Sequence, residues 1–397
     1  MKIAVIGAGA SGIIAALKAS ENNHVILIDK NDKCGKKLLV TGNGRCNYWH
    51  DNISKDAYYT DDYDGLESIL SYSEEVYDYL LSLGIYPRIK DGYYYPQSNS
   101  AYSIREIFAC ELKKRNIDFK YNFNVIKIEK EDYGFKIISD NETILCDKLI
   151  IATGSKAMPK SGSDGFGYEI AKKFNINVNK VLPSLVSLNT SENFLKDWSG
   201  IRTDAKVSLF INDKYVNSEI GEIQLTDNGV SGICVFNLSG KAIRSFEEGK
   251  NVFLSINFAP FIEDFYHFFE ERSNIINNQN IKELCESLFN YKLSNIFFKK
   301  CNINPNAYWK SLTDKEKELF VKTITNFHIK IDGYGSFDKA QVCTGGISLK
   351  EIDENTMECK KVKGLYYIGE TLDVDGICGG YNLAFAFISG YIAGKSV

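Results

Sequence analysis

The chain has 397 residues, of which 44% are hydrophobic and 25% are charged, and its formal net charge is −4. This composition is that of a globular protein with a sizeable core, so disorder along the whole chain is excluded. The slight acidity argues against a general nucleic-acid binder, and no run of about 18 apolar residues predicts a transmembrane helix. Ten cysteines without a C-x-x-C pair disfavour a metal site, and without a secretory signal they predict a reduced, cytoplasmic protein.

The first thirty residues predict a dinucleotide-binding unit. An apolar strand leads into the glycine motif G-A-G-A-S-G, a helix-forming stretch follows, and a second apolar strand ends in Asp29. In this motif Gly7 makes the tight turn, Gly9 lets the backbone approach a pyrophosphate, and Gly12 allows the helix to pack closely on the strand. The helix N-terminus faces the phosphates, and Asp29 can accept hydrogen bonds from a ribose diol. The motif alone does not separate FAD from NAD.

Two later segments favour FAD. Residues 148–154 form an apolar strand that ends in A-T-G, the kind of strand that returns the chain to the sheet near the cofactor in two-dinucleotide-binding-domain flavoproteins. Residues 364–370 form another apolar strand, and its end in Gly369-Glu370 resembles the FAD motif whose carboxylate binds the ribityl chain. A helix that opens at Gly379-Gly380 is expected to aim its positive end at the flavin N1/C2=O edge. The FAD site is therefore expected to be built from both ends of the chain.

Three further motifs carry a family resemblance. They are T-G-N-G-R-C-N at residues 41–47, A-Q-V-C-T-G-G-I-S-L at residues 340–349, and L-D-V-D-G-I-x-G-G-Y-N-L at residues 372–383. Together they resemble the YhiN/BaiN/RdsA-type flavoproteins, whose members are also labelled NAD(P)/FAD-dependent or HI0933-like oxidoreductases, or an aminoacetone oxidase family. The resemblance spans nearly the whole chain.

The resemblance implies an α/β fold: a Rossmann-like FAD-binding domain interrupted by an insert with a β-barrel-like part and a helical part. Residues 206–211 alternate before a turn at Asn212-Asp213, as expected of strands, and Thr313-Asp314-Lys315-Glu316 predicts a helix start. The expected boundaries are 1–187 and 336–397 for the FAD-binding domain, 188–261 and 327–335 for the β part, and 262–326 for the helical part.

The sequence departs from the family pattern at a few positions. The family often reads F-T-H-x-G-x-S-G-P inside the insert, but here the His is Asp227 and the Pro is Ile233. The usual A-T-G-G ends in Ser155, and Phe166 stands where an Asp is common. These changes leave FAD binding intact, but the substrate of a relative does not transfer directly to this chain.

The motifs and the resemblance together predict a set of cofactor-binding residues that comes from both ends of the chain. The predicted FAD-binding residues are Gly7, Gly9, Ala10, Ser11, Gly12, Asp29, Lys30, Lys37, Thr41, Gly42, Asn43, Gly44, Val125, Ala152, Thr153, Gly154, Gly369, Glu370, Asp375, Gly379, Gly380, Tyr381, Asn382 and Leu383.

Three residues in these segments are candidates for catalysis, and each has a structural alternative. Arg45 can stabilise negative charge on a flavin or an enolate, or it can simply bind FAD or form a salt bridge. Cys46 can donate a proton, or it can pack as a small buried hydrophobe. Tyr381 can hydrogen-bond a carbonyl, or it can shape the helix start.

An aromatic segment around residue 94 is the candidate substrate platform. Tyr93, Tyr95 and Pro96 belong to a G-x-x-F/Y-P segment that lies near the active site in the family, where tyrosines can stack a flat substrate. The alternative is a strand that buries alternate tyrosines. The four histidines lie outside all these segments, so none is expected to be the central acid or base, and a metal site is not expected.

The function expected first is reduction of a polarised C=C bond in a small, enone- or steroid-like molecule, driven by NADH or NADPH. Because the chain has no second G-x-G-x-x-G motif, the nicotinamide is expected to visit the flavin only transiently. The alternative is a ribosomal RNA dihydrouridine synthase, which reduces the C5=C6 bond of uracil and would need RNA as its partner. An O₂-using amine oxidase and a non-enzymatic flavin-binding scaffold are further alternatives.

Overall fold

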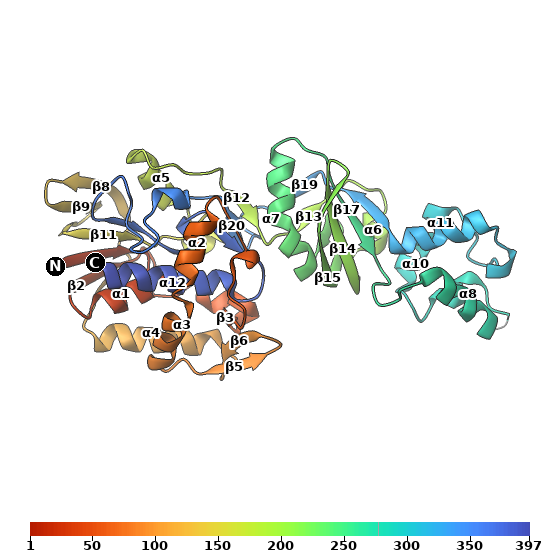
Figure 1. Cartoon of the computed structure of the whole chain (residues 1–397), viewed down its shortest axis with the longest axis horizontal. Coiled ribbons are helices and arrows are strands. Elements are labelled where there is room, and N and C mark those ends of the chain that lie inside the picture. Colours follow the sequence, from red (N-terminus) through yellow and green to blue (C-terminus); the bar gives the residue numbers. More distant parts are fainter. Residues whose placement is uncertain (277) are drawn as a thin grey trace. The chain divides into compact units, whose positions relative to one another are not determined.

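The computed structural model describes residues 1–276 and 278–397, which divide into two compact units. Unit 1 comprises Met1–Pro183 and Ala340–Val397, and unit 2 comprises Ser184–Lys339 (Figure 1). The first unit is thus assembled from both ends of the chain, and the second is an insert.

The centre of unit 1 is a five-stranded parallel sheet with the order β21-β11-β1-β2-β7. Its strands are β1 (Lys2–Ile6), β2 (His24–Ile28), β7 (Asp118–Lys120), β11 (Lys148–Ile151) and β21 (Leu365–Tyr367). β1 pairs with both β2 and β11, and its residues Ile3–Val5 are completely buried. An apolar run without alternation is expected of a strand that is covered on both faces. The Rossmann-like part of the predicted fold class is therefore confirmed.

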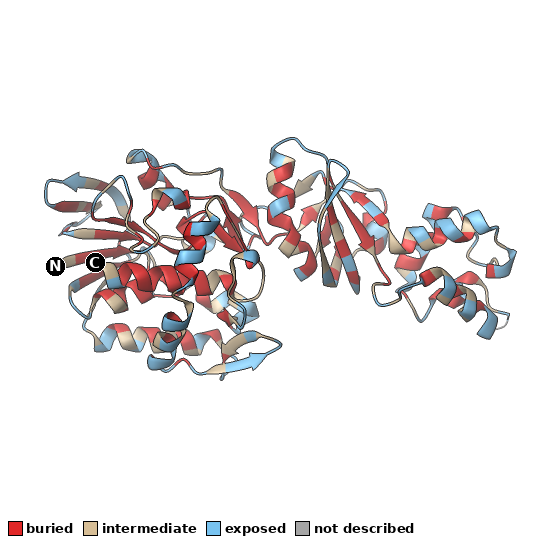
Figure 2. Cartoon of the chain, viewed as in Figure 1, coloured by how far each residue is buried: buried red, intermediate tan, exposed pale blue. Residues whose placement is uncertain are grey.

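Two helices from opposite ends of the chain lie side by side on this sheet. They are α1 (Ala10–Ala19) and α12 (Tyr381–Ser396) (Figure 1). Their backbones approach closely because α12 carries Gly390 and Gly394, where a Cβ would lie 2.4 Å from the Ser11 carbonyl oxygen and 2.6 Å from that of Ala15. Figure 2 shows the resulting core, with buried residues on the central strands and along α12.

Smaller sheets and further helices complete unit 1. The antiparallel sheet β10-β9-β8 packs against β1 and β11, and a second small sheet has the order β3-β6-β5. The strands are β3 (Trp49–His50), β4 (Tyr58–Thr60), β5 (Pro87–Lys90), β6 (Tyr93–Pro96), β8 (Val125–Glu131), β9 (Gly134–Ser139), β10 (Thr143–Cys146), β12 (Leu182–Ser184), β20 (Val342–Thr344) and β22 (Val374–Gly376). The helices are α2 (Tyr63–Leu70), α3 (Ser73–Ser82), α4 (Ala101–Lys114) and α5 (Phe166–Lys173).

Unit 2 contains a seven-stranded antiparallel sheet with the order β18-β17-β14-β15-β16-β13-β19. Its strands are β13 (Leu188–Asn189), β14 (Arg202–Ile211), β15 (Lys214–Thr226), β16 (Gly229–Ser231), β17 (Val252–Asn257), β18 (Phe327–Lys330) and β19 (Gly333–Tyr334). Among the described strands, the edge strands β18 and β19 do not pair, so the sheet is not a closed barrel. Only two residues separate β18 from β19 along the chain, so the two edges must converge at one end. The sheet is therefore curved like a barrel but open.

The helices of unit 2 fall into two groups. α7 (Ile233–Glu247) packs on β14 and β15, and the short α6 (Leu195–Trp198) precedes β14. The helical part contains α8 (Phe265–Ile275), α9 (Ile281–Cys285), α10 (Tyr291–Cys301) and α11 (Asp314–Thr325). The predicted helix start before α11 is confirmed, because Thr313 and Glu316 form a reciprocal capping box. Within residues 1–276 and 278–397, no helix has both the length and the apolarity needed to cross a bilayer.

Candidate flavin site

The glycine turn of unit 1 has two glycines fixed by packing and one that faces open space. A Cβ at Gly7, whose φ is +105°, would lie 2.3 Å from the Ala152 carbonyl oxygen. A Cβ at Gly12 would lie 1.8 Å from the Gly7 carbonyl oxygen, so any side chain there would push the helix off the strand. At Gly9, by contrast, no atom of the described residues comes within 4 Å of an added Cβ. The open space beside Gly9 is where a pyrophosphate would fit.

The start of α1 is suited to an anion. Gly9 is the N-cap residue, and the described chain supplies neither a side-chain cap nor an acidic residue in the first turn. The first N–H groups of a helix have no intrahelical acceptor, and the helix dipole places partial positive charge there. The first-turn residues Ala10 and Ser11, both predicted to bind the cofactor, are therefore available to hold phosphate oxygens.

Asp29 fixes the glycine turn from the end of β2. Its carboxylate accepts a hydrogen bond from the Ala8 N–H at 2.7 Å and from the backbone and side-chain N–H groups of Asn31 at 2.8 and 2.9 Å. The Asp29 carbonyl accepts from the Phe123 N–H at 2.9 Å, two residues before Val125 at the start of β8. The next residue in the chain, Lys30, forms an ion pair with Asp164 at 2.6 Å. These contacts bring Asp29, Lys30 and the region of Val125 together at one end of β2.

Glu370 joins three segments that are distant in sequence. Its carboxylate accepts from the Lys37 Nζ at 2.7 Å, from the Ser155 Oγ at 2.7 Å and from the Cys343 N–H at 3.3 Å. Ser155, which replaces the last glycine of the usual A-T-G-G, thus acts here as a hydrogen-bond donor to the acid of the FAD motif. Burial, and then the nearby Glu370, raise the pKa of the Cys343 thiol to about 11.

The A-T-G segment leaves one polar atom unsatisfied. The Thr153 Oγ1 is buried and has no hydrogen-bond partner among the described residues. Buried hydroxyls are rarely left unpaired, so an orphaned one is expected to meet a ligand. Together with the open space at Gly9 and the uncapped start of α1, this atom fits a site for a dinucleotide such as FAD.

The G-G-Y-N motif forms the start of α12. Gly380 has a φ of +95°, and a Cβ there would lie within 2.8 Å of three backbone atoms of Trp49. The Asn382 side chain accepts from the Gly376 N–H at 2.9 Å and donates to the Gly376 carbonyl at 2.8 Å. The motif therefore locks β22, which contains the buried Asp375, and β3 against the helix start. Leu383 lies in the first turn of the same helix.

Tyr381 is the centre of a cluster of rings at this helix start. Its backbone carbonyl accepts from the buried Tyr58 hydroxyl at 2.9 Å. Its ring stacks on His50 with the centroids 4.9 Å apart, and His50 meets Tyr93 edge-on at 5.1 Å. Burial, and then the neighbouring Tyr93, raise the pKa of the Tyr381 hydroxyl above its ordinary value. Tyr381 is therefore protonated at neutral pH and can donate a hydrogen bond.

His50 lies near this site although its position in the sequence does not indicate it. β3 pairs with β6 in the register His50–Tyr93, which brings His50 beside the predicted tyrosines. The His50 Nδ1 accepts from the Asn52 N–H at 3.0 Å, so the neutral ring carries its proton on Nε2. No motif surrounds His50, and a hydrophobic pattern over two residues is too short to predict this pairing.

The other two catalytic candidates differ in exposure. The guanidinium carbon of the exposed Arg45 lies 5.4 Å from the centre of the Tyr95 ring, and the Arg45 Nε donates to the Gly42 carbonyl at 3.3 Å. Cys46 is completely buried, and burial raises the pKa of its thiol to about 11. Arg45 is thus presented to solvent with one of the tyrosines, whereas Cys46 packs in the core.

The backbone of the T-G-N-G loop is unusual. Gly42, Asn43 and Gly44 all have left-handed φ values of 55°, 54° and 80°, and all three are exposed next to the half-buried Thr41. Pro96, which follows Tyr95 at the end of β6, is buried. Within the described part of the chain, no cluster of three or more His, Cys, Asp or Glu side chains is arranged to hold a metal ion.

The parallel sheet, the glycine turn and the strand–helix return from the C-terminus define the fold of an FAD-type dinucleotide-binding oxidoreductase. The family model described as the HI0933-like protein Rossmann domain matches residues 1–396. The chain therefore belongs to this family of flavoprotein oxidoreductases.

Curated relatives align over the whole chain. A 3-dehydro-bile acid delta(4,6)-reductase from Clostridium scindens is 32% identical over 403 residues, covering 100% of this chain and 98% of the relative. A ribosomal RNA dihydrouridine synthase from Escherichia coli is 29% identical over 401 residues, covering 99% and 97%.

Solved structures share the fold. The open conformation of a flavocytochrome c3 fumarate reductase has a TM-score of 0.52 at 14% identity, covering 100% of this chain and 77% of that one. A 3-ketosteroid delta1-dehydrogenase from Sterolibacterium denitrificans has a TM-score of 0.50 at 11% identity, covering 99% and 98%. At such identities the likeness concerns the fold alone.

Proposed function

We propose that the protein is an FAD-dependent reductase that uses NADH or NADPH to reduce a polarised C=C bond in a small, enone-like molecule. The observation that carries the proposal is the ring cluster at the start of α12, where Tyr381, His50 and Tyr93 meet beside the G-G-Y-N motif. The 32% identity to a bile acid reductase over the full chain supports it. When bound, FAD supplies two-electron hydride transfer between the nicotinamide and the substrate.

The protein must supply the charge stabilisation, and the proton can come from solvent. Net reduction adds a hydride to one alkene carbon and a proton to the other, and negative charge develops on the carbonyl oxygen between these steps. Tyr381 can donate a hydrogen bond to this oxygen because its hydroxyl stays protonated. The His50 Nε2–H is a second donor, and Arg45 beside Tyr95 adds positive charge. We assign Cys46 to packing, because its thiol is buried.

The proposal is tested by the oxidant that the protein prefers. The flavin is reduced anaerobically with NADH or NADPH, and its absorbance is followed after addition of a cyclic enone, ribosomal RNA or O₂. Fast reoxidation by the enone alone is expected. Failure of the enone to reoxidise the flavin would exclude the proposed substrate class, and faster reoxidation by O₂ with an amine as reductant would indicate the amine oxidase.

Substitutions separate the role of Tyr381 from a structural one. Tyr381→Phe is expected to keep FAD and to slow enone turnover by roughly 100-fold, the scale of one lost hydrogen-bond donor to a developing oxyanion. Tyr133→Phe is the matched control, because Tyr133 is 97% exposed in the turn between β8 and β9. Equal turnover of the two variants would remove Tyr381 from the mechanism.

A second function remains open because another observation favours it. The dihydrouridine synthase relative also aligns over the whole chain, and reduction of the uracil C5=C6 bond is the same chemistry on another substrate. In unit 2, residues 287–313 contain four lysines and no Asp or Glu, and so offer positive charge to RNA. In the reoxidation assay this function is recognised by fast turnover with RNA and formation of dihydrouridine.

A further inference from the structure

One segment of the helical part carries basic residues at about the average frequency of the chain but no acidic ones. Residues 287–313 contain Lys292, Lys299, Lys300 and Lys310 and no Asp or Glu, although the whole chain has a net charge of −4. Five asparagines lie in the same segment. The segment therefore carries a local net positive charge, whose meaning depends on where the fold places its lysines.

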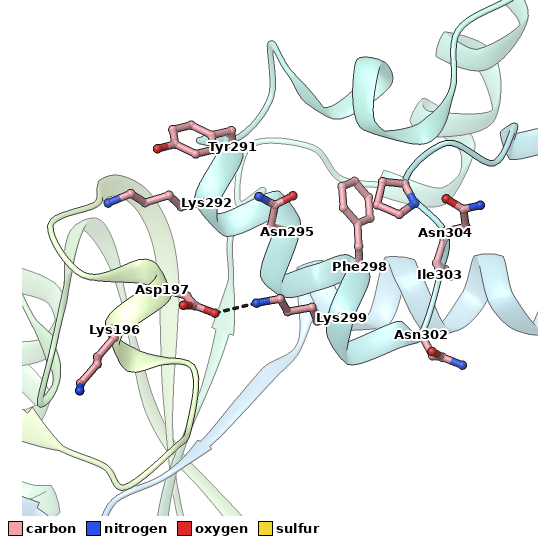
Figure 3. Close-up of a pocket in the computed structure, with 11 residues that line it drawn as sticks. Lys196, Asp197, Tyr291, Lys292, Asn295, Phe298, Lys299, Asn302, Ile303 and Asn304 are labelled. Carbon is pink, nitrogen blue, oxygen red and sulfur yellow. Dashed lines mark hydrogen bonds and ion pairs between the residues drawn. The ribbon is translucent and has the colours of Figure 1, made fainter.

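This segment lines a cleft of about 750 Å³ between α6 and α10. Lys196 comes from α6, and Lys292 and Lys299 come from α10 (Figure 3). The Lys299 Nζ pairs with Asp197, the one acid in the lining, at 2.8 Å. In the described part of the chain, neither Lys196 nor Lys292 has an ion-pair partner. The lining therefore has an excess of positive charge.

The Lys299–Asp197 pair does not block an anion. Both side chains are more than half exposed, and an exposed ion pair contributes only about 0–1 kcal/mol to stability. Lys299 can therefore exchange its carboxylate for a phosphate at little cost.

The other walls of the cleft carry groups that can recognise a base. Tyr291 is 64% exposed at the start of α10, and Figure 3 shows it next to Lys292 and one turn from Asn295. Asn302 and Asn304 contribute two more amides at the far end of the helix. An exposed aromatic ring stacks on any base, and amides hydrogen-bond to base edges. Phe298, Ile303 and Pro305 add apolar surface to the same walls.

We propose that the α6–α10 cleft is a nucleotide-binding site, in which Lys196, Lys292 and Lys299 hold phosphate and Tyr291 stacks on the base. A free nucleotide and a nucleotide within single-stranded RNA present this same chemistry. The proposal stands on unit 2 alone and is independent of the substrate reduced at the flavin.

The first test measures binding to the full-length, FAD-loaded protein. Fluorescence anisotropy of a labelled 12-nucleotide RNA is followed at 50 mM salt, with ATP and inorganic pyrophosphate as competitors. Lys292→Glu is expected to weaken binding about tenfold, because one phosphate contact is lost. Lys315→Glu is the matched control, since both residues occupy the second position of a helix, where an acid is favourable. Lys315 lies outside the cleft lining.

The second test concerns the base. Tyr291→Ala is expected to weaken binding between about fivefold and 100-fold, the range of one lost stacking interaction. Tyr308→Ala, at an exposed tyrosine outside the lining, is expected to leave it unchanged. Competition by ATP would identify free nucleotides as the ligand, and RNA binding that ATP does not compete would identify RNA.

Three results would overturn the proposal. In the first, neither RNA nor ATP binds saturably. In the second, Lys292→Glu and Lys315→Glu weaken RNA binding equally. In the third, pyrophosphate competes with RNA, and Tyr291→Ala does not change RNA binding. The second would reduce the segment to diffuse surface charge, and the third to a simple anion site. None of these results depends on enone turnover, so they leave the proposed reductase function untouched.

Discussion

The glycine turn allows a sharp separation of cofactor binding from folding. We predict that Gly9→Leu strongly weakens FAD binding but leaves the apoprotein folded. The backbone of Gly9 is extended, with φ −82° and ψ −167°, so a leucine can adopt it without strain. No atom of the described residues lies within 4 Å of the new Cβ, so the side chain starts in the open space where the pyrophosphate would bind.

The size of the effect follows from the hydrogen bonds that are lost. Moving the pyrophosphate away from the start of α1 breaks at least two hydrogen bonds to a charged group, each about 1.5 kcal/mol or more. A loss of about 3 kcal/mol weakens FAD binding by roughly 150-fold. The matched variant is Gly12→Ala, whose Cβ would lie 1.8 Å from the Gly7 carbonyl oxygen, so it is expected to lower the free energy of unfolding by about 3 kcal/mol or more.

The assay uses protein stripped of FAD. Titration with FAD, followed by quenching of flavin fluorescence, gives the affinity, and thermal unfolding of the apoprotein gives the stability. Gly9→Leu should unfold at the wild-type temperature and bind FAD poorly, whereas Gly12→Ala should unfold early even without FAD. Wild-type FAD affinity in Gly9→Leu would refute the placement of the pyrophosphate beside this residue.

Three further predictions concern the ring cluster, the reactivity of the thiols and the loss of stability at acidic pH. Tyr58→Phe removes the donor to the Tyr381 carbonyl and should lower the free energy of unfolding by about 1–3 kcal/mol, measured by denaturant titration; an unchanged midpoint would contradict the bond. Iodoacetamide at pH 8 should label the exposed Cys110 and leave Cys46 unlabelled, because burial raises the pKa of the Cys46 thiol to about 11. Mass spectrometry measures the labelling, and early modification of Cys46 would show that this thiol is accessible to solvent. Hydrogen bonds and charge from the C-terminal helix lower the pKa of the Glu75 carboxyl in the folded protein. The ionised Glu75 therefore stabilises the fold above the unfolded pKa near 4.5, and this contribution is lost as the pH falls through the lower folded pKa. Glu75→Gln should therefore flatten the decline of the unfolding temperature between pH 5 and 3, and an unchanged slope would show that the contact is too exposed to contribute.

The sequence alone predicted the parts of the fold that depend on short-range patterns. The buried strand β1, the glycine turn and Asp29 lie within thirty residues, and each has a local physical signature. The capping box at Thr313 is equally local. The return of the C-terminal segment to the FAD-binding domain was predicted from recognisable motifs and from the family resemblance.

Other features were decided only by the tertiary structure. Glu370 meets Lys37 and Ser155 across separations of 333 and 215 residues, and no periodic pattern encodes such pairs. His50 entered the ring cluster because a two-residue strand pairs with β6 and packs against Gly380. The seven-stranded sheet is open, because its edge strands β18 and β19 are not paired with each other among the described strands.

The cleft in unit 2 depends both on local sequence and on tertiary packing. The lysines of residues 287–313 are visible in the sequence, where each short basic cluster looks like an ordinary solvated surface. Only the packing of α6 against α10 gathers Lys196, Lys292 and Lys299 around one hollow and leaves Tyr291 exposed beside it. Local patterns fix which residues form helices and strands, because those energies act over a few residues. Which faces then meet depends on long-range packing, and this packing creates the sites.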